Sequence, residues 1–406
     1  MPTASENRIE ARLSRAARTL ASRPGMRDFA PAADNVISLT IGMPAPDLFP
    51  SAQLAALTQE VLAREADQAL QYGQLLGVPG LRAYLAARLN EQEGLQLGPD
   101  QFIITAGSSQ AIAMLGQMFV DPDDTVLVEG PSFIGALRTF RMLGARIVEV
   151  ALDDSGLVVD DLAPLLDKLD ADGVRPKFLY TMPTFQNPTG VTLPAERRAS
   201  LIALARERDL LIVEDDAYGD LRYDGQTLPS LLSLDRDGLV VRLGTFSKIM
   251  AAGVRLGWAV GPPELIAGLA SMKVDAGTSP FASHLAAAFG RSGQLDRHIQ
   301  ILRAGYHRRR DAMLQALKEH CAPYATWTYP EGGFFIWVRL KPHVSPERMH
   351  EAAAREGVTY VPGNVCFASG EGQECLRLAF SFAPEDQMPE AIARLGRAMA
   401  SASPSC

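Results

Sequence analysis

Short apolar runs alternate with stretches of helical character between about residue 55 and residue 285. The runs are rich in Val, Ile and Leu, as are strands that lie buried on both faces of a parallel sheet. Regular alternation of strands and helices indicates a sheet with helices on both of its faces. The chain is therefore expected to have an α/β fold with a mostly parallel, seven-stranded sheet. The expected strands are Phe102–Thr105, Val126–Val128, Ile147–Val150, Phe178–Thr181, Leu210–Val213, Val240–Leu243 and Trp258–Val260.

The pattern changes after about residue 290, where a long helical stretch precedes several further apolar runs. These runs, near residues 332–338, 361–363 and 377–380, are expected to be strands of a small α+β domain. We expect residues 1–50 to be an N-terminal segment that joins the small domain. Residues 51–290 are expected to form the large domain, and residues 291–406 the small C-terminal domain.

The composition of the chain excludes some classes of function. A chain of 406 residues is long enough for two domains with substantial cores, and its 47% hydrophobic content is ordinary for a globular protein. A net charge of −8 argues against nucleic acid or an anionic membrane as the main partner. No run approaches the 18 consecutive apolar residues of a membrane span. We therefore expect a soluble protein with small-molecule ligands.

The four cysteines are Cys321, Cys366, Cys375 and Cys406, and no two of them form a CxxC pair. The N-terminal region has arginines but lacks the apolar centre of a secretory signal, and it carries acidic residues that make a poor targeting peptide. Reduced thiols in a cytoplasmic protein are the expectation.

The most informative segment surrounds Lys248, which follows the apolar run 239–243. A lysine desolvated beside another cation loses its proton readily, as a Schiff-base nucleophile requires. The hydroxyls of Thr245 and Ser247, with the guanidinium of Arg255, suit a phosphate dianion. An amine beside a phosphate cradle is what pyridoxal 5′-phosphate requires. Taken alone, the segment is equally compatible with an exposed loop lysine.

Two further segments lie where parallel strands end, the edge at which ligands meet an open α/β sheet. Asn187 begins an Asn-Pro-Thr-Gly turn after one strand, and the next strand ends in three acids, Glu214, Asp215 and Asp216. Because neighbouring carboxylates repel one another, a cationic ligand such as a pyridinium would explain their presence. Upstream, Ser108 and Ser109 open a helix whose N-terminus would suit a phosphate, although an ordinary serine N-cap fits as well.

Together these segments resemble the class I/II pyridoxal 5′-phosphate-dependent aminotransferases of fold type I. The resemblance is greatest to the branch with 2-aminoadipate and kynurenine aminotransferases and the aminotransferase-like half of MocR-type regulators. It covers nearly the whole chain, from Val36 to Ser381, and five separate motifs occur in the expected order. It implies a large domain that binds pyridoxal 5′-phosphate, a small domain, a homodimer with shared active sites and no metal.

The resemblance also implies a role for each candidate residue. Lys248 would form the Schiff base with the cofactor and carry the proton between substrate Cα and cofactor C4′. Asp215 would pair with the pyridine nitrogen, while Asn187 and Tyr218 would hydrogen-bond the phenolic oxygen. Arg377 would clamp the substrate α-carboxylate, which Asn187 would also border. The phosphate would be held by Ser108, Ser109, Thr245, Ser247 and Arg255.

Other residues concern cofactor packing and specificity. Phe133 stands where the family stacks a ring on the cofactor, commonly a tyrosine, and Tyr72 resembles the tyrosine that reaches the neighbouring subunit's phosphate. Simple packing in the core is the alternative for both rings. Ile41 replaces the first of two glycines, so that with Gly42 it would border the substrate side chain. Arg27 resembles a residue that reaches acidic side chains, although pairing with a surface carboxylate is as good an explanation. A pocket for both apolar and acidic side chains is the resulting hypothesis.

The expected function is transfer of the α-amino group of an L-amino acid to a 2-oxo acid, with 2-oxoglutarate as acceptor and a ping-pong mechanism. The donor would be 2-aminoadipate-like, aromatic or branched-chain. A decarboxylase, racemase, β-lyase or oxidase would need the same lysine, aspartate and phosphate cradle, so these stay alternatives. A ligand-sensing regulator is disfavoured, since about 30 residues before Ile37 are too few for a DNA-binding domain.

Overall fold

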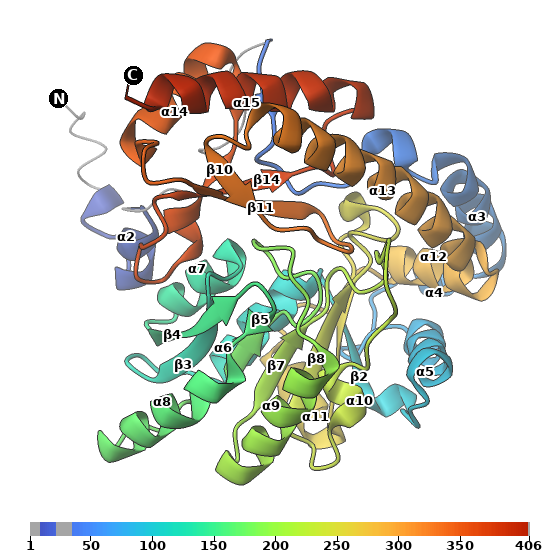
Figure 1. The fold of residues 1–406 in the computed structure, drawn as a ribbon. Coiled ribbons are helices and arrows are strands. Elements are labelled where there is room, and N and C mark those ends of the chain that lie inside the picture. Colours follow the sequence, from blue (N-terminus) through green and yellow to red (C-terminus); the bar gives the residue numbers. More distant parts are fainter. Residues whose placement is uncertain (1–8, 22–34, 405–406) are drawn as a thin grey trace.

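A computed structural model describes residues 9–21 and 35–404, and at its centre lies an eight-stranded sheet with helices on both faces (Figure 1). The strand order is β2-β9-β8-β7-β6-β3-β4-β5. Neighbours from β8 to β4 are parallel, whereas β9 runs antiparallel to both β2 and β8. The strands are β2 (Phe102–Thr105), β3 (Thr125–Gly130), β4 (Arg146–Asp153), β5 (Gly156–Leu157), β6 (Leu179–Thr181), β7 (Ile212–Asp215), β8 (Val240–Thr245) and β9 (Gly257–Val260).

All seven expected strands are present, so the mostly parallel sheet is confirmed. The eighth strand, β5, is a two-residue addition that pairs antiparallel with the end of β4, too short to show in the sequence pattern. Strand β7 begins and ends two residues later than expected, so Asp215 is the last residue of the strand. Every residue of β2, β6, β7 and β9 is buried, because helices cover both faces of the sheet.

Most helices of the alternating part of the chain pack around this sheet, whereas α3 and α4 pack on α12. Helix α5 is followed by Gly94, whose φ of 67° is the left-handed conformation that favours glycine at a helix C-terminus. The helices are α3 (Ser51–Arg64), α4 (Ala66–Ala69), α5 (Pro79–Glu93), α6 (Ser108–Phe119), α7 (Ile134–Met142), α8 (Val159–Ala171), α9 (Ala195–Arg208), α10 (Leu231–Leu234), α11 (Pro263–Met272) and α12 (Pro280–Arg291). Short 3-10 turns are η2 (Pro46–Leu48), η3 (Pro99–Gln101) and η4 (Ala252–Val254), and α2 (Arg15–Ala21) packs on α7.

A second, antiparallel sheet has the order β10-β11-β14-β13 and lies beside the long helices near the C-terminus (Figure 1). Helix α15 packs on α13 and α14, and its buried residues, such as Ile392, Leu395 and Met399, recur at helical spacing. The elements are α13 (Gln294–His320), β10 (Ala325–Trp327), β11 (Phe335–Leu340), α14 (Pro346–Glu356), β12 (Val358–Thr359), β13 (Val361–Pro362), η5 (Gly363–Cys366), β14 (Cys375–Ala379), η6 (Glu385–Gln387) and α15 (Met388–Ala402).

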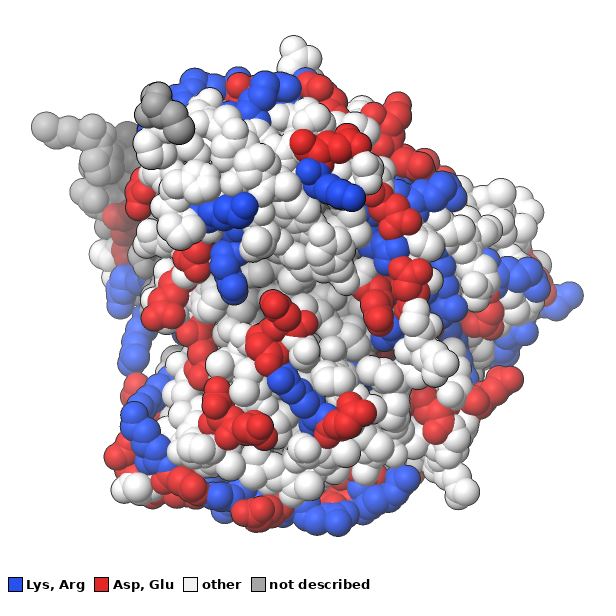
Figure 2. Space-filling model, viewed as in Figure 1, with Lys and Arg blue, Asp and Glu red and all other residues white. Residues whose placement is uncertain are grey.

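The segment before α3 lies against this C-terminal region. Strand β1 (Ile37–Ser38) pairs in parallel with β12, and the amide of Ala379 in β14 donates to the carbonyl of Leu39. These bonds bring residues 41–43 to the space between the two sheets. On the face shown in Figure 2, acidic and basic side chains are interspersed. No helix among the described residues is long and apolar enough to cross a membrane.

Candidate active site

A cavity of about 240 Å³ lies where the carboxyl ends of the parallel strands meet the small sheet. Strand β7 and the loops after β6 and β8 supply one side, and β11 and β14 supply the opposite side. Loops at the carboxyl ends of parallel strands are the usual ligand site of such sheets. The predicted residues that line it are Ile41, Gly42, Ser108, Ser109, Phe133, Asn187, Asp215, Tyr218, Thr245, Ser247, Lys248, Arg255 and Arg377.

Lys248 follows β8 and directs its amine into this cavity, where Nζ donates to the carbonyl of Gly42 at 2.9 Å. Burial lowers the pKa of Lys248 to about 8, and the positive charges of Arg377 and Arg255 act in the same direction. Asp215 opposes them to a smaller extent. The amine is therefore neutral far more often than an ordinary lysine.

Asp215 is fully enclosed at the end of β7. The hydroxyl of Tyr180 donates to its Oδ2 at 2.6 Å, while Oδ1 has no hydrogen-bond partner among the described residues. Burial raises the pKa of Asp215 to about 7, although the bond from Tyr180 works in the opposite direction. A buried carboxylate oxygen without a donor calls for a cationic N–H group in the cavity.

The opposite wall carries Arg377, which is buried in the middle of β14. Its Nη1 donates to Asn187 Oδ1 at 3.0 Å and its Nη2 to the carbonyl of Thr40 at 2.8 Å. Its Nε has no partner in the part of the chain that the structure describes. The guanidinium lies 4.4 Å from the ring centre of Phe335, so its plane is fixed by stacking as well as by hydrogen bonds.

The remaining polar groups gather at the N-terminus of α6. Helix α6 begins after Gly107, whose φ is 80°, and a Cβ added there would lie 2.9 Å from Arg255 Nη2. Only glycine therefore lets the Arg255 side chain approach the first turn of α6. With Ser108 and Ser109 on the helix and Thr245 and Ser247 beyond β8, these groups form a concave, positively charged site that fits a phosphate.

Three predicted residues differ in how the structure places them. Phe133, half-buried at the start of α7, lines the cavity as expected. Tyr72 does not line the cavity and is 83% exposed. Arg27 lies outside the described residues.

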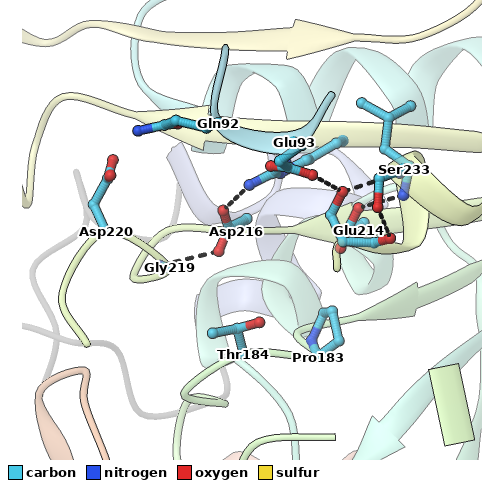
Figure 3. Close-up of polar contacts among 12 residues, drawn as sticks. Gln92, Glu93, Pro183, Thr184, Glu214, Asp216, Gly219, Asp220 and Ser233 are labelled. Atoms are coloured by element: carbon cyan, nitrogen blue, oxygen red, sulfur yellow. Dashed lines mark hydrogen bonds and ion pairs between the residues drawn. The ribbon is translucent and has the colours of Figure 1, made fainter. Parts of the chain in front are cut away.

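The interpretation of the three acids as one group is wrong. Alternation along β7 directs Asp215 into the cavity and Glu214 to the other face of the sheet. There the Glu214 carboxylate accepts hydrogen bonds from the amides of Leu231 and Leu232 at 2.9 and 3.0 Å. Asp216 also points away from the cavity, into a polar cluster with Glu93 (Figure 3). The acids other than Asp215 therefore have structural partners of their own.

Sequence reasoning missed Tyr180 and Phe335. A tyrosine in an otherwise apolar, buried strand needs a partner for its hydroxyl, and this signal could have linked Tyr180 to Asp215. Phe335 lies in an aromatic strand that gives no separate indication of a site. Its ring also fills the space beside Gly42, where an added Cβ would lie 2.5 Å from Phe335 Cζ.

Comparison with known proteins agrees with this geometry. The chain matches the family described as aminotransferase class I and II over residues 34–395. It is 41% identical to aromatic-amino-acid aminotransferase 1 of Thermococcus litoralis, with 89% of this chain and 87% of that protein covered. It also matches the structure of a Pyrococcus horikoshii kynurenine aminotransferase with PMP (TM-score 0.92, 37% identity, 98% and 99% covered). A third match is an α-aminoadipate aminotransferase of Thermus thermophilus bound to N-(5′-phosphopyridoxyl)-L-leucine (TM-score 0.89, 33% identity, 97% and 98% covered).

The chain therefore belongs to the class I and II aminotransferases, and it has their α/β fold of type I. It is an enzyme that depends on pyridoxal 5′-phosphate. The residues present fit that cofactor on two counts. The orphan oxygen of Asp215 matches a protonated pyridine nitrogen, and the cradle at α6 matches a phosphate.

Proposed function

We propose that this aminotransferase takes the α-amino group of L-amino acids with aromatic, branched-chain or 2-aminoadipate-like side chains. It passes the group to 2-oxoglutarate in a ping-pong cycle. The observation that carries the proposal is the position of Arg377, a buried guanidinium whose Nε has no partner among the described residues, opposite a lysine with a lowered pKa. An α-carboxylate bound by Arg377 would bring the substrate Cα toward Lys248.

The donor class follows from the lining of the same cavity. Ile41, Met43, Met182 and Phe133 give it an apolar wall around the polar groups that hold the cofactor and the carboxylate. Apolar side chains gain free energy when they leave water for such a wall, by about 0.8 kcal/mol for each buried CH₂. This favours leucine-like and aromatic donors.

Each residue of the site then has a defined role. The cofactor supplies a carbonyl that takes up the amino group and a pyridinium that withdraws electrons from Cα. Asp215 would keep that pyridinium protonated, and Asn187 and Tyr218 would donate toward the phenolic oxygen. Lys248 would take the proton from the substrate Cα and deliver it to cofactor C4′. The cradle groups at the N-terminus of α6, together with Arg255, hold the phosphate.

We also propose that the protein works as a cytoplasmic homodimer with active sites at the subunit interface. The support lies in exposed apolar side chains, Leu70, Tyr72, Leu75 and Val274, on two neighbouring loops. The amide of Gly73 donates to the carbonyl of Ala276 at 3.1 Å, so these loops are tied together. Exposed apolar patches of this kind favour contact with another subunit. Tyr72 would then reach the phosphate of the partner's cofactor. Residues 51–290 would be the large domain and 291–406 the small one, with 1–50 joining the latter.

The test is the visible absorbance of the purified enzyme with pyridoxal 5′-phosphate, challenged in turn with each standard L-amino acid and with L-2-aminoadipate. We expect aromatic amino acids, leucine and 2-aminoadipate to bleach the band of the lysine-bound cofactor, and 2-oxoglutarate to restore it. Release of CO₂ or H₂O₂, or racemisation without bleaching, would instead identify a decarboxylase, oxidase or racemase. A folded protein with no such band would refute the role of Lys248.

A further inference from the structure

A second cavity, of about 220 Å³, adjoins the active site and shares Ala217 and Thr245 with it. Its central group is Arg242 of β8, which forms ion pairs with Glu93, the last residue of α5, and with Asp216, the residue after β7. All three side chains are 13% exposed. These three residues form an ion-pair cluster, and Figure 3 shows Glu93 and Asp216 on neighbouring segments within it. One guanidinium therefore serves two carboxylates from different elements.

The cluster is connected to the active site through the backbone. Asp216 follows Asp215 directly, and its Oδ1 accepts a hydrogen bond from the amide of Gly219 at 3.0 Å (Figure 3). A Cβ at Gly219 would collide with the Asp216 carboxylate, so this turn closes tightly around it. Tyr218 lies inside the turn. By holding Asp216, Arg242 holds the backbone that carries both Asp215 and Tyr218.

The cluster is also connected electrostatically. The negative charge of Asp216 is one of the causes that raise the pKa of Asp215, after burial. The pKa of Arg242 lies well above its ordinary value because Asp216, Glu93 and Glu214 outweigh the cost of its burial, so it stays a cation. Other charged groups face the cluster from the elements packed around it: Arg88, Arg198, Asp220, Arg222 and Arg303. Arg88 is itself paired with Asp220, and Arg198 and Arg303 donate to backbone carbonyls.

We propose that Arg242 is a positioning residue that balances the charge of Asp216 and thereby sets the proton affinity at Asp215 and Lys248. The inference rests on the proposed roles of those two residues. Without the Arg242 cation, the uncompensated Asp216 carboxylate makes the active site more negative. The linkage between Lys248 and the cofactor then keeps its proton to higher pH. Without the Asp216 anion, the linkage loses its proton at lower pH.

The experiment is a pH titration of the visible absorbance band of the holoenzyme, which reports protonation of the lysine–cofactor linkage without turnover. Arg242→Met should raise the midpoint by about one pH unit, and Asp216→Asn should lower it by a similar amount. Asn keeps the oxygen that accepts from Gly219, so it removes charge without opening the turn. The double variant should return to within a few tenths of a unit of the wild type.

The matched control is Arg206→Met, which breaks an exposed ion pair with Asp237 and should leave the midpoint unchanged. If Arg242→Met does not fold, Glu93→Gln replaces it. Glu93→Gln removes an anion from the same guanidinium and should lower the midpoint. Equal midpoints in all variants, or shifts of the same sign in Arg242→Met and Asp216→Asn, would overturn the inference. A folded wild type that shows no band of the lysine-bound cofactor at any pH would refute the role of Lys248 itself.

Discussion

The lowered pKa of Lys248 leads to a quantitative prediction for the apoenzyme. With a pKa of about 8 in place of 10.5, about a tenth of the amines are neutral at pH 7, which is about 300 times the fraction of an ordinary lysine. Burial is the largest cause and the charge of Arg377 the next. Arg377→Met should therefore raise the pKa of Lys248 above 8 but not restore 10.5, because burial remains.

The assay is the rate at which trinitrobenzenesulfonate, which attacks neutral amines, labels Lys248 in the apoenzyme as a function of pH, with labelled peptides measured by mass spectrometry. The wild-type rate should have its midpoint near pH 8, and Arg377→Met should shift the midpoint upward. Arg355→Met, an exposed arginine of α14, is the matched control and should not shift it. A wild-type midpoint near pH 10 would refute the reasoning, and so would an unshifted Arg377→Met.

The same shift makes Lys248 destabilising when protonated. Its folded pKa is below its unfolded value, so the unfolded chain binds more protons between about pH 8 and 10.5, and stability rises with pH across that window. The free energy of unfolding of Lys248→Met should therefore exceed that of the wild-type apoenzyme at pH 7 by at most about 3 kcal/mol, as measured by denaturant titration. That advantage should shrink as the pH approaches 10.5. An advantage that does not change with pH would point to packing rather than charge.

Two further predictions concern Asp215 and Tyr72. Asp215→Asn should keep the cofactor bound but lower kcat at least about 100-fold, because a neutral amide cannot hold the pyridinium proton. Absorbance would measure cofactor binding and stopped-flow kinetics the rate. An unchanged kcat would contradict the prediction. Tyr72→Phe should leave a dimer by light scattering but raise the dissociation constant of pyridoxal 5′-phosphate about tenfold, the loss of one hydrogen bond. A monomeric wild type would refute a shared site, and an unchanged dissociation constant would refute the role of the Tyr72 hydroxyl.

Much of the fold and of the candidate site could be predicted from the local sequence. Uninterrupted apolar runs identify buried strands whatever surrounds them, so seven of the eight strands of the main sheet were predicted near their observed positions. The candidate residues at strand ends were also brought together, because carboxyl ends of parallel strands share one edge of the sheet. Strand β5 and the exact end of β7 were missed, since two residues carry no periodic signal.

What only the tertiary structure decided is which neighbour each polar group meets. Glu214, Asp215 and Asp216 are alike in the sequence, yet strand alternation and the position of Arg242 send one to the cofactor site and two to a separate cluster. The sequence by itself determined the strands and the Lys248 motif, because these depend on residues adjacent in the chain. The pairing of Tyr180 with Asp215 and the stacking of Arg377 on Phe335 depend on distances across the fold. Such distances are fixed only when the elements pack.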